Sequence, residues 1–331
     1  MVSIAINGFG RIGRQAFRAG FGKKNVSFVG INDLTDTKTL AHLLKHDTSY
    51  GAYDHEVSFD EKNIIVDGTK IPVFAEKDPS ALPWGKMSVD VVLECTGRFT
   101  TKEGAEMHIT AGAKAVIVSA PAKGGVPTYV LGVNADKLNE EPSKVINNAS
   151  CTTNCISPVM AVLEEKFGIE KAMMTTVHGY TADQNIQDGP HKDLRRARAA
   201  AENITPTTTG AALATTEAIP VLKGKFDGLA IRVPVPTVSL SDITAVLKKD
   251  VTIEEVNAAL IEASKSKNLQ GILGVTDEEL VSSDFVGNSN SATVDLKLTN
   301  VIGGNLVKVV AWYDNEYGYA HRLIEMAEKF V

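Results

Sequence analysis

The chain has 331 residues, 44% of them hydrophobic and 22% charged, a composition that is ordinary for a globular protein and a length that predicts two domains. Its net charge of -6 leaves no basic surplus to neutralise phosphates, so we expect no nucleic acid as the main ligand. The sequence shows no signal-peptide pattern and no run of about 18 apolar residues, and its three cysteines are an odd number, so we expect a cytoplasmic protein that does not bind to a membrane.

The first part of the chain alternates between expected strands and helices. Short apolar runs that end in turn residues predict strands at residues 2–7, 26–33, 89–97 and 113–121. Apolar residues at helical spacing predict helices at residues 11–21, 37–47 and 101–113. Alternating residues and turn signals in 56–74 predict a meander of short strands. This order implies a mostly parallel sheet.

The second part of the chain has a different pattern of expected elements, with longer strands and a long polar stretch. A helix is expected at residues 153–167, followed by a strand at 171–181 and a long polar stretch at 182–209. Long strands are expected within residues 229–249, 291–298 and 305–315, and an amphipathic helix closes the chain. We therefore expect an antiparallel or mixed sheet with two or three helices, and we find no internal repeat.

A glycine-rich turn follows the first expected strand. Gly8, Gly10 and Gly13 form a G-x-G-x-x-G that opens a helix, which is the context in which this pattern binds a dinucleotide. The first glycine permits the tight turn, the second lets backbone approach the pyrophosphate, and the third allows close packing of helix on strand. Asp33 ends the second strand, where a carboxylate binds the adenosine ribose and repels a 2′-phosphate. The pattern favours NAD over NADP, the alternative being a glycine turn with a surface aspartate.

The stretch NNASCTTNC, residues 147–155, holds two of the three cysteines. A structural zinc site needs four ligands, and no second cysteine pair exists, so we expect no metal. His42 and His46 lack the glutamate of the metalloprotease pattern between them, and solvated histidines are the better interpretation. Two hypotheses remain for Cys151, a buried structural cysteine or an activated nucleophile.

Position favours the nucleophile for Cys151. It is expected at the N-terminus of a helix, where free N–H groups and the helix dipole stabilise a thiolate. Cys155, one turn further on, and Cys95, at the end of a strand, are interpreted as structural. A thiolate beside NAD suggests attack on an aldehyde, giving a thiohemiacetal that is oxidised to a thioester with the help of a base. Spacing alone does not choose that base among seven histidines.

Six motifs together resemble phosphorylating glyceraldehyde-3-phosphate dehydrogenases. They are INGFGRIGR (6–14), SCTTNC (150–155), TTVHGYT (175–181), RRARAAAENITPTTTGAA (195–212), RVPVPTVSLSD (232–242) and WYDNEYGY (312–319). The resemblance implies a Rossmann NAD-binding domain at residues 1–149, completed by a C-terminal helix at 316–331, and a catalytic domain at 150–315. It also implies a homotetramer.

The resemblance also implies residue roles. Cys151 is expected as the nucleophile and His178 as the base, which can stabilise the oxyanion as an imidazolium. Thr181 and Arg232 are expected to bind the substrate phosphate. The attacking inorganic phosphate is expected at Ser150, Thr152, Arg196, Thr209 and Gly210, with Arg195 and Arg198 as alternatives to Arg196. The cofactor is expected at Gly8, Gly10, Arg11, Ile12, Gly13, Asp33, Lys77, Thr96, Ser119 and Asn315.

The expected reaction converts D-glyceraldehyde 3-phosphate, NAD and phosphate to 1,3-bisphosphoglycerate and NADH, as in glycolysis and gluconeogenesis. A near alternative is an erythrose-4-phosphate dehydrogenase of the same architecture, in which water releases the acid. A more distant alternative is an NAD-binding or RNA-binding regulatory protein that has kept the fold. The full set of matching catalytic residues argues against the regulatory protein, and the net charge of -6 argues against RNA.

Overall fold

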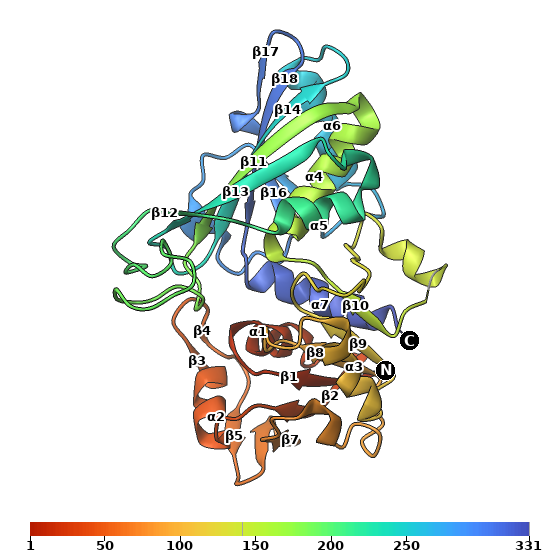
Figure 1. Cartoon of the computed structure of the whole chain (residues 1–331), viewed down its shortest axis with the longest axis vertical. Coiled ribbons are helices and arrows are strands. Elements are labelled where there is room, and N and C mark those ends of the chain that lie inside the picture. The colour runs from red at the N-terminus through yellow and green to blue at the C-terminus, as the bar shows by residue number, and fades with distance from the viewer. Residues whose placement is uncertain (141, 331) are drawn as a thin grey trace. The chain divides into compact units, whose positions relative to one another are not determined.

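The computed structural model describes residues 1–140 and 142–330, and its backbone contacts divide the chain into two units. The first unit comprises Met1–Tyr129, Lys137–Ala149 and the C-terminal stretch from Ala320, and the second comprises Val130–Asp136 and Ser150–Tyr319 (Figure 1). Among the described residues, no helix has the length and apolar character needed to cross a membrane.

The first unit is built on an eight-stranded sheet. Its strands are β1 (Val2–Asn7), β2 (Val26–Asn32), β5 (Val57–Phe59), β6 (Asn63–Val66), β7 (Thr69–Phe74), β8 (Val91–Glu94), β9 (Ala115–Val118) and β10 (Val145–Asn147), and a separate ribbon pairs β3 (His46–Asp47) with β4 (Gly51–Ala52). The spatial order is β10-β9-β8-β1-β2-β7-β6-β5. Pairing is parallel from β10 to β7 and antiparallel in the β7-β6-β5 meander, as expected for a Rossmann-type sheet with an added hairpin.

The strands at the centre of this sheet are covered on both faces. Every residue of β8 and β9 is buried, which is typical of parallel strands between layers of helices. The helices of this unit are α1 (Arg11–Gly20), α2 (Thr37–Lys45), α3 (Lys102–Thr110) and most of α7 (Tyr317–Glu328). Gly20 allows α7 to pack on α1, because a Cβ there would lie 3.0 Å from the side chain of Ile324. The expected return of the C-terminal helix to the first domain is confirmed.

The second unit is built on a mixed sheet. Its strands are β11 (Ile169–Gly179), β12 (Thr205–Thr207), β13 (Phe226–Val233), β14 (Ser239–Leu247), β15 (Leu273–Thr276), β16 (Ala292–Asp295), β17 (Asn300–Ile302) and β18 (Leu306–Tyr313). The order is β12-β13-β11-β14-β18-β16-β15, with β17 paired to β18. Two of the pairings, β11 with β13 and β15 with β16, are parallel, and the others are antiparallel, as the sequence predicts.

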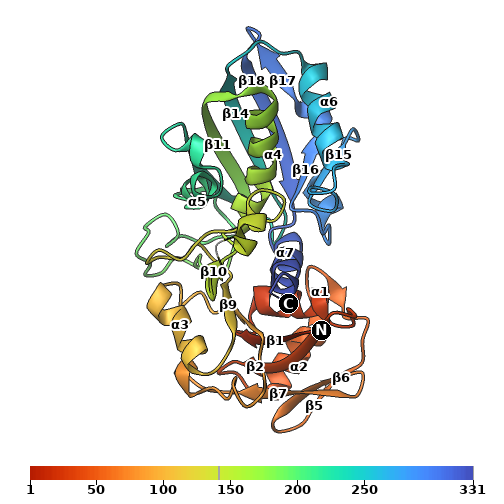
Figure 2. The same ribbon diagram turned by 90° about the vertical axis from the view of Figure 1, so that its right-hand side faces the viewer.

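Three helices pack on this mixed sheet, α4 (Cys151–Phe167), α5 (Ala211–Ala218) and α6 (Ile253–Ser264). Figure 2 shows α4 and α6 running along the strands on one face of the sheet, and α4 contacts both β14 and β16. The other face carries exposed apolar side chains, including Met173, Leu229 and Leu306. The fold class expected from the sequence, a parallel Rossmann-type domain with a second, mixed-sheet domain, is confirmed.

The boundaries of three expected elements differ from the sequence analysis. The helix expected at 153–167 begins two residues earlier, at Cys151, because the side chain of Ser150 caps it. The run expected as strand at 229–249 breaks into β13 and β14, since it contains two prolines and Val238 has a positive φ of 70°. The helix expected at 101–113 ends at Thr110, before Gly112 with its φ of 101°.

Candidate active site

The glycine turn lies between β1 and α1 in the first unit. Gly8 has a φ of 91°, a conformation that strains other residues. A Cβ at Gly13 would lie 2.2 Å from the carbonyl oxygen of Gly8, so only glycine lets the helix approach this closely. At Gly10, by contrast, a Cβ would meet nothing within 4 Å. Gly10 therefore faces open space at a helix N-terminus, as expected where a pyrophosphate binds.

A crevice of about 510 Å³ opens beside this turn. Its walls include Gly8, Gly10, Asp33, Lys77 and Thr96. The carboxylate of Asp33 accepts hydrogen bonds from the backbone N–H of Phe9 at 2.8 Å and of Thr35 at 3.0 Å, which fixes its position. The sequence-predicted residues of the adenosine half of the cofactor site thus converge in one unit.

Five expected cofactor residues lie outside that wall: Arg11, Ile12, Gly13, Ser119 and Asn315. Arg11 and Ile12 form the first turn of α1 with Gly13, but the guanidinium of Arg11 is paired with Asp47 at 2.6 Å, so the backbone of this turn is the part suited to a pyrophosphate. Ser119 follows β9 and hydrogen-bonds the thiol of Cys95. Cys95 itself lines the crevice, although the sequence suggested a purely structural cysteine.

The second unit places a thiol beside an imidazole. Cys151 is the first residue of α4, half-buried, and its Sγ lies 3.5 Å from Nε2 of His178 near the end of β11. Ser150 caps the helix by accepting a hydrogen bond from the N–H of Thr153 at 3.0 Å. Cys155 is fully buried, one turn further along, as expected for a structural cysteine.

The tautomer of His178 follows from its neighbours. Nδ1 lies 2.6 Å from the carbonyl oxygen of Gly179, and two acceptors do not approach so closely, so Nδ1 carries the proton and donates. Arg232 Nη1, 3.1 Å from Nδ1, can only donate, and it is satisfied by the same carbonyl at 3.2 Å. Nε2 is left as the acceptor that faces the thiol. This is the tautomer that a general base needs.

The shifted pKa values of Cys151 and His178 favour a neutral thiol and a neutral imidazole in the chain without substrate. Burial raises the pKa of the Cys151 thiol, against the opposing effects of Arg232 and of hydrogen bonds from Thr152. Burial and then the charge of Arg232 lower the pKa of His178 to about 3. Thiol and imidazole are therefore both favoured in their uncharged forms, whereas the sequence suggested a thiolate.

Arg232 stands next to His178 because of the strand register. β11 and β13 are parallel, and His178 pairs with Arg232 across them. Arg232 Nη1 also lies 3.3 Å from the hydroxyl of Thr181, while its buried Nε has no hydrogen-bond partner in the described part of the chain. An unpartnered guanidinium N–H beside a threonine hydroxyl is suited to a phosphate.

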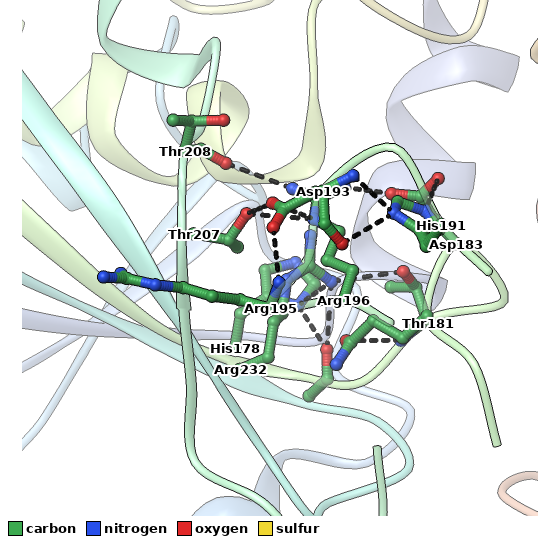
Figure 3. A network of polar contacts seen from close by, with 12 residues as sticks. His178, Thr181, Asp183, His191, Asp193, Arg195, Arg196, Thr207, Thr208 and Arg232 are labelled. Atoms are coloured by element: carbon green, nitrogen blue, oxygen red, sulfur yellow. Dashed lines mark hydrogen bonds and ion pairs between the residues drawn. The ribbon is translucent and has the colours of Figure 1, made fainter. Parts of the chain in front are cut away.

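Arg196 is the arginine of the 195–198 run that faces this group. Its charge acts on both His178 and Arg232, and Figure 3 shows it between them and residues 207–208. Its Nε lies 3.0 Å from the hydroxyl of Thr207, and its guanidinium pairs with Asp183. The alternatives point elsewhere: Arg195 is exposed and Arg198 pairs with Asp188 at 2.8 Å.

The remaining phosphate residues cluster where α4 and α5 begin. Ser150 and Gly210 are the N-caps of these helices, and the hydroxyl of Thr153 links them, lying 2.7 Å from Ser150 Oγ and 3.5 Å from the carbonyl oxygen of Ala211. Thr209 precedes Gly210. Two helix N-termini in one place favour an anion. The hydroxyl of Thr152 is already engaged, with the phenol of Tyr313 at 2.8 Å and with the thiol of Cys151.

Asn315 follows β18 and is nearly buried. Ser239 accepts from the N–H of Gly179 at 3.2 Å and donates to Asn315 Oδ1 at 2.9 Å. With its oxygen engaged, the amide nitrogen of Asn315 is the group that can donate to a carboxamide such as that of nicotinamide.

Sequence reasoning missed several polar groups around the thiol. Tyr313 bridges the hydroxyls of Thr152 and Thr176, each at 2.8 Å, and so ties the helix of Cys151 to the strand of His178. Ser239 and Asp183 hold Asn315 and Arg196. Tyr313 and Ser239 lie within the quoted motifs, but a motif does not reveal their contacts, because their partners are far away in sequence.

Comparison with known proteins gives consistent matches over the chain. Residues 2–102 match the family model "Glyceraldehyde 3-phosphate dehydrogenase, NAD binding domain", and residues 150–315 match "Glyceraldehyde 3-phosphate dehydrogenase, C-terminal domain". The chain is 56% identical to the glyceraldehyde-3-phosphate dehydrogenase of Geobacillus stearothermophilus over 98% of this chain and 97% of that one. It is 55% identical to glyceraldehyde-3-phosphate dehydrogenase 1 of Bacillus subtilis, with the same coverage of both.

Proposed function

The chain belongs to the glyceraldehyde-3-phosphate dehydrogenase family, and we propose how its residues carry out the NAD-dependent conversion of D-glyceraldehyde 3-phosphate and inorganic phosphate to 1,3-bisphosphoglycerate. The observation that carries the proposal is the thiol of Cys151, 3.5 Å from the unprotonated Nε2 of His178, with two guanidinium groups close by. The relatives are named for the three-carbon substrate, so the four-carbon alternative is not favoured.

The first step is the attack of Cys151 on the aldehyde carbon. Its sulfur forms the C–S bond, and the thiol proton passes to Nε2 of His178. The imidazolium then gives this proton to the former carbonyl oxygen, which becomes the hydroxyl of a thiohemiacetal. The N–H groups at the start of α4 stabilise the negative charge as it develops on that oxygen.

Substrate binding itself favours this proton transfer. Arg232 meets the imidazole at Nδ1, whereas Cys151 meets it at Nε2, so the guanidinium is nearer to the ring than to the sulfur. A phosphate bound to Arg232 and Thr181 offsets the positive charge that lowers the pKa of His178. Burial still lowers the pKa of His178, but the bound phosphate raises it relative to the chain without substrate, which favours acceptance of the thiol proton.

Oxidation of the thiohemiacetal needs a hydride acceptor and a base. The crevice of the first unit fits a dinucleotide: Gly10 leaves room for backbone approach, and Asp33 offers a carboxylate to ribose hydroxyls. Bound NAD supplies the hydride acceptor. His178 removes the hydroxyl proton of the thiohemiacetal, leaving a thioester on Cys151.

Inorganic phosphate then releases the product. The N-termini of α4 and α5, with Arg196, hold the anion near the thioester carbon. A phosphate oxygen attacks that carbon, the C–S bond breaks, and the thiolate of Cys151 leaves and takes a proton from His178. The product is an acyl phosphate.

Self-association to a homotetramer is part of the proposal. The sheet face of the second unit that is not covered by helices exposes Met173 by 67% and Leu229 by 43%. A second copy of the chain would cover this apolar surface. Light scattering would test it: a mass of four chains is expected, and Met173→Glu should lower the mass, whereas a monomeric wild type would refute the assembly.

The cytoplasm is the expected compartment. All three cysteines are free thiols, and Cys151 must stay reduced to react. Cell fractionation would test this location, and recovery of the protein outside the cytoplasm would contradict it.

The decisive experiment measures NADH production from each triose or tetrose phosphate with and without inorganic phosphate. We expect glyceraldehyde 3-phosphate to be the preferred substrate and sustained turnover to need phosphate. Without phosphate, mass spectrometry should find the acyl group on Cys151. Phosphate-independent turnover of erythrose 4-phosphate would favour the alternative, and absence of the acyl adduct would refute the thioester route.

A further inference from the structure

A fully buried carboxylate lies beneath the cofactor crevice, and the proposed reaction does not use it. Glu94 is the last residue of β8, and its side chain and that of His108 on α3 have no exposed surface. Oε2 of Glu94 lies 3.1 Å from Nε2 of His108 and 2.5 Å from the amide nitrogen of Asn7, the last residue of β1. Two strands and a helix thus meet at one oxygen.

The tautomer of His108 follows from its other nitrogen. The indole N–H of Trp84 lies 3.1 Å from Nδ1 of His108, and an indole nitrogen can only donate. Nδ1 is therefore the acceptor, and the ring proton sits on Nε2, where it points to Glu94. In this arrangement His108 is a neutral donor rather than an imidazolium.

The second oxygen of Glu94 binds Thr96, another residue that lines the crevice. Oε1 accepts the backbone N–H of Thr96 at 2.8 Å and also the hydroxyl of Thr96. The carboxylate therefore has four donors, from Asn7, His108 and twice from Thr96, and each donor is uncharged. Such a set suits an ionised carboxylate, because every donor needs a lone pair and none is left for a proton.

Glu94 lies at the point of the sheet where ligands are expected to bind. β1 and β8 are neighbouring strands; β1 is followed by β2 on one side, and β8 is followed by β9 on the other. The crevice at their carboxyl ends is therefore the topological switch point, where such folds bind ligands. The walls approach closely there, since a Cβ at Gly8 would lie 2.7 Å from the nitrogen of Thr96. Glu94 accepts hydrogen bonds from Thr96 and from Asn7, the residue just before Gly8.

The bonding continues along the wall toward the ribose side. Oδ1 of Asn7 accepts from the amide of Asn32 at 2.7 Å, and Asn32 exchanges hydrogen bonds of 2.9 Å with the backbone of Glu76. Asn7, Asn32 and Glu76 all line the crevice, and Asn32 immediately precedes Asp33. A displacement of Glu94 would therefore reach both walls.

We propose that Glu94, kept ionised by a neutral His108, is a positioning residue for the cofactor that sets the spacing between the glycine turn and Thr96. The inference rests on the proposed placement of NAD in this crevice. Replacing the carboxylate by an amide turns one acceptor into a donor, so either Thr96 or the pair of Asn7 and His108 then faces a donor. The walls separate, and the cofactor loses contacts that depend on their spacing.

Glu94→Gln in the full-length protein tests the proposal, with Glu106→Gln as the matched control, because Glu106 is an exposed carboxylate on α3. By titration calorimetry we expect Glu94→Gln to weaken NAD binding about tenfold, as for a buried donor left unpaired. We expect kcat at saturating NAD to stay within about threefold of wild type, and Glu106→Gln to bind like wild type. A folded Glu94→Gln with wild-type affinity, or one in which kcat falls as much as affinity, overturns the proposal.

A second pair of variants decides the question if Glu94→Gln does not fold. Glutamine can replace a neutral histidine as donor and acceptor, so His108→Gln should keep NAD affinity within about threefold, whereas His108→Leu should lose about tenfold. The chain has two tryptophans, and the indole N–H signal of Trp84, assigned with Trp84→Phe, should be retained in His108→Gln and shifted in His108→Leu. Equal affinities of the two variants overturn the proposal. Failure of the wild type to reduce NAD would instead refute the proposed function.

Discussion

The two polar clusters described above differ in the sign of the charged groups placed beside the binding site. Around the glycine turn, the carboxylates of Asp33 and Glu94 are held by backbone and side-chain donors that carry no charge. Around the thiol, two guanidinium groups, Arg196 and Arg232, flank a neutral imidazole. The first cluster is suited to hydroxyls and to an anion bound by helix N–H groups, and the second to anionic substrates. Four changes would break or sharpen this contrast.

The largest effect is expected at the thiol itself. Cys151→Ser should lower kcat by about 10⁴-fold or more, as for other covalent nucleophiles, while NAD binding persists because the crevice residues belong to the other unit. Stopped-flow or steady-state NADH absorbance measures the loss. Cys155→Ala is the control, because the sulfur of Cys155 is buried and lies 3.9 Å from the backbone carbonyl oxygen of Ala311. This variant should keep kcat within about threefold of wild type. Substantial turnover by Cys151→Ser would contradict the assignment.

Removing a guanidinium tests the positive side of the contrast. Arg232→Gln should raise KM for glyceraldehyde 3-phosphate about 100-fold, because it removes charge-assisted hydrogen bonds to phosphate. It should also raise the pKa of His178, since the charge of Arg232 lowers it. Steady-state kinetics and the pH dependence of Cys151 alkylation report the two effects. Arg195→Gln, which alters an exposed arginine, should change neither, and an unchanged KM in Arg232→Gln would place the substrate phosphate elsewhere.

Two glycines of the turn separate cofactor binding from folding. Gly10→Ala adds a Cβ that meets no atom of the chain, so the fold should persist while NAD affinity falls about tenfold, because the added methyl occupies the approach of the pyrophosphate. Gly13→Ala forces a Cβ against the carbonyl oxygen of Gly8 and should lower both stability and affinity. Calorimetric titration and thermal melts distinguish the pair. Normal NAD binding by Gly10→Ala would argue against this placement of the cofactor.

The smallest effect concerns acid stability. His178 has a pKa of about 3 in the folded chain, against about 6.5 when unfolded, so between these values the unfolded chain binds more protons and stability falls as the pH falls. This group alone contributes up to about 1.4 kcal/mol per pH unit. His178→Asn should therefore show a shallower decrease of Tm between pH 6 and 4 than wild type. Parallel curves would mean that His178 is already charged in the folded chain.

The arrangement of the glycine turn and Asp33 was predictable because its parts are local. Gly8, Gly10, Gly13 and Asp33 lie within one strand–helix–strand unit, so spacing along the chain fixes their arrangement in space. Glu94 and His108 escaped notice for the opposite reason. Their contact depends on the pairing of β8 with β1 and on where α3 packs against the sheet, and neither residue belongs to a recognisable pattern.

The thiol site was predictable only in part. A helix N-terminus at Cys151 follows from the sequence, but its partner among the histidines came from family resemblance, because β11 and β13 place His178 beside Arg232 only once they pair. The hydroxyl of Thr152 illustrates the remainder. The family resemblance places this hydroxyl at the inorganic phosphate, and the structure adds its bond with Tyr313, which a pattern of hydroxyl residues does not reveal.

The pairing of β11 with β13 makes the site sensitive to insertions as well as to substitutions. Neighbouring side chains along a strand point to opposite faces, so a slip of a single residue in either strand would carry His178 or Arg232 through the sheet. β14 holds the other edge of β11 in antiparallel register along most of its length, which resists such a slip. A one-residue deletion within either strand should therefore silence the enzyme even with every active-site side chain present.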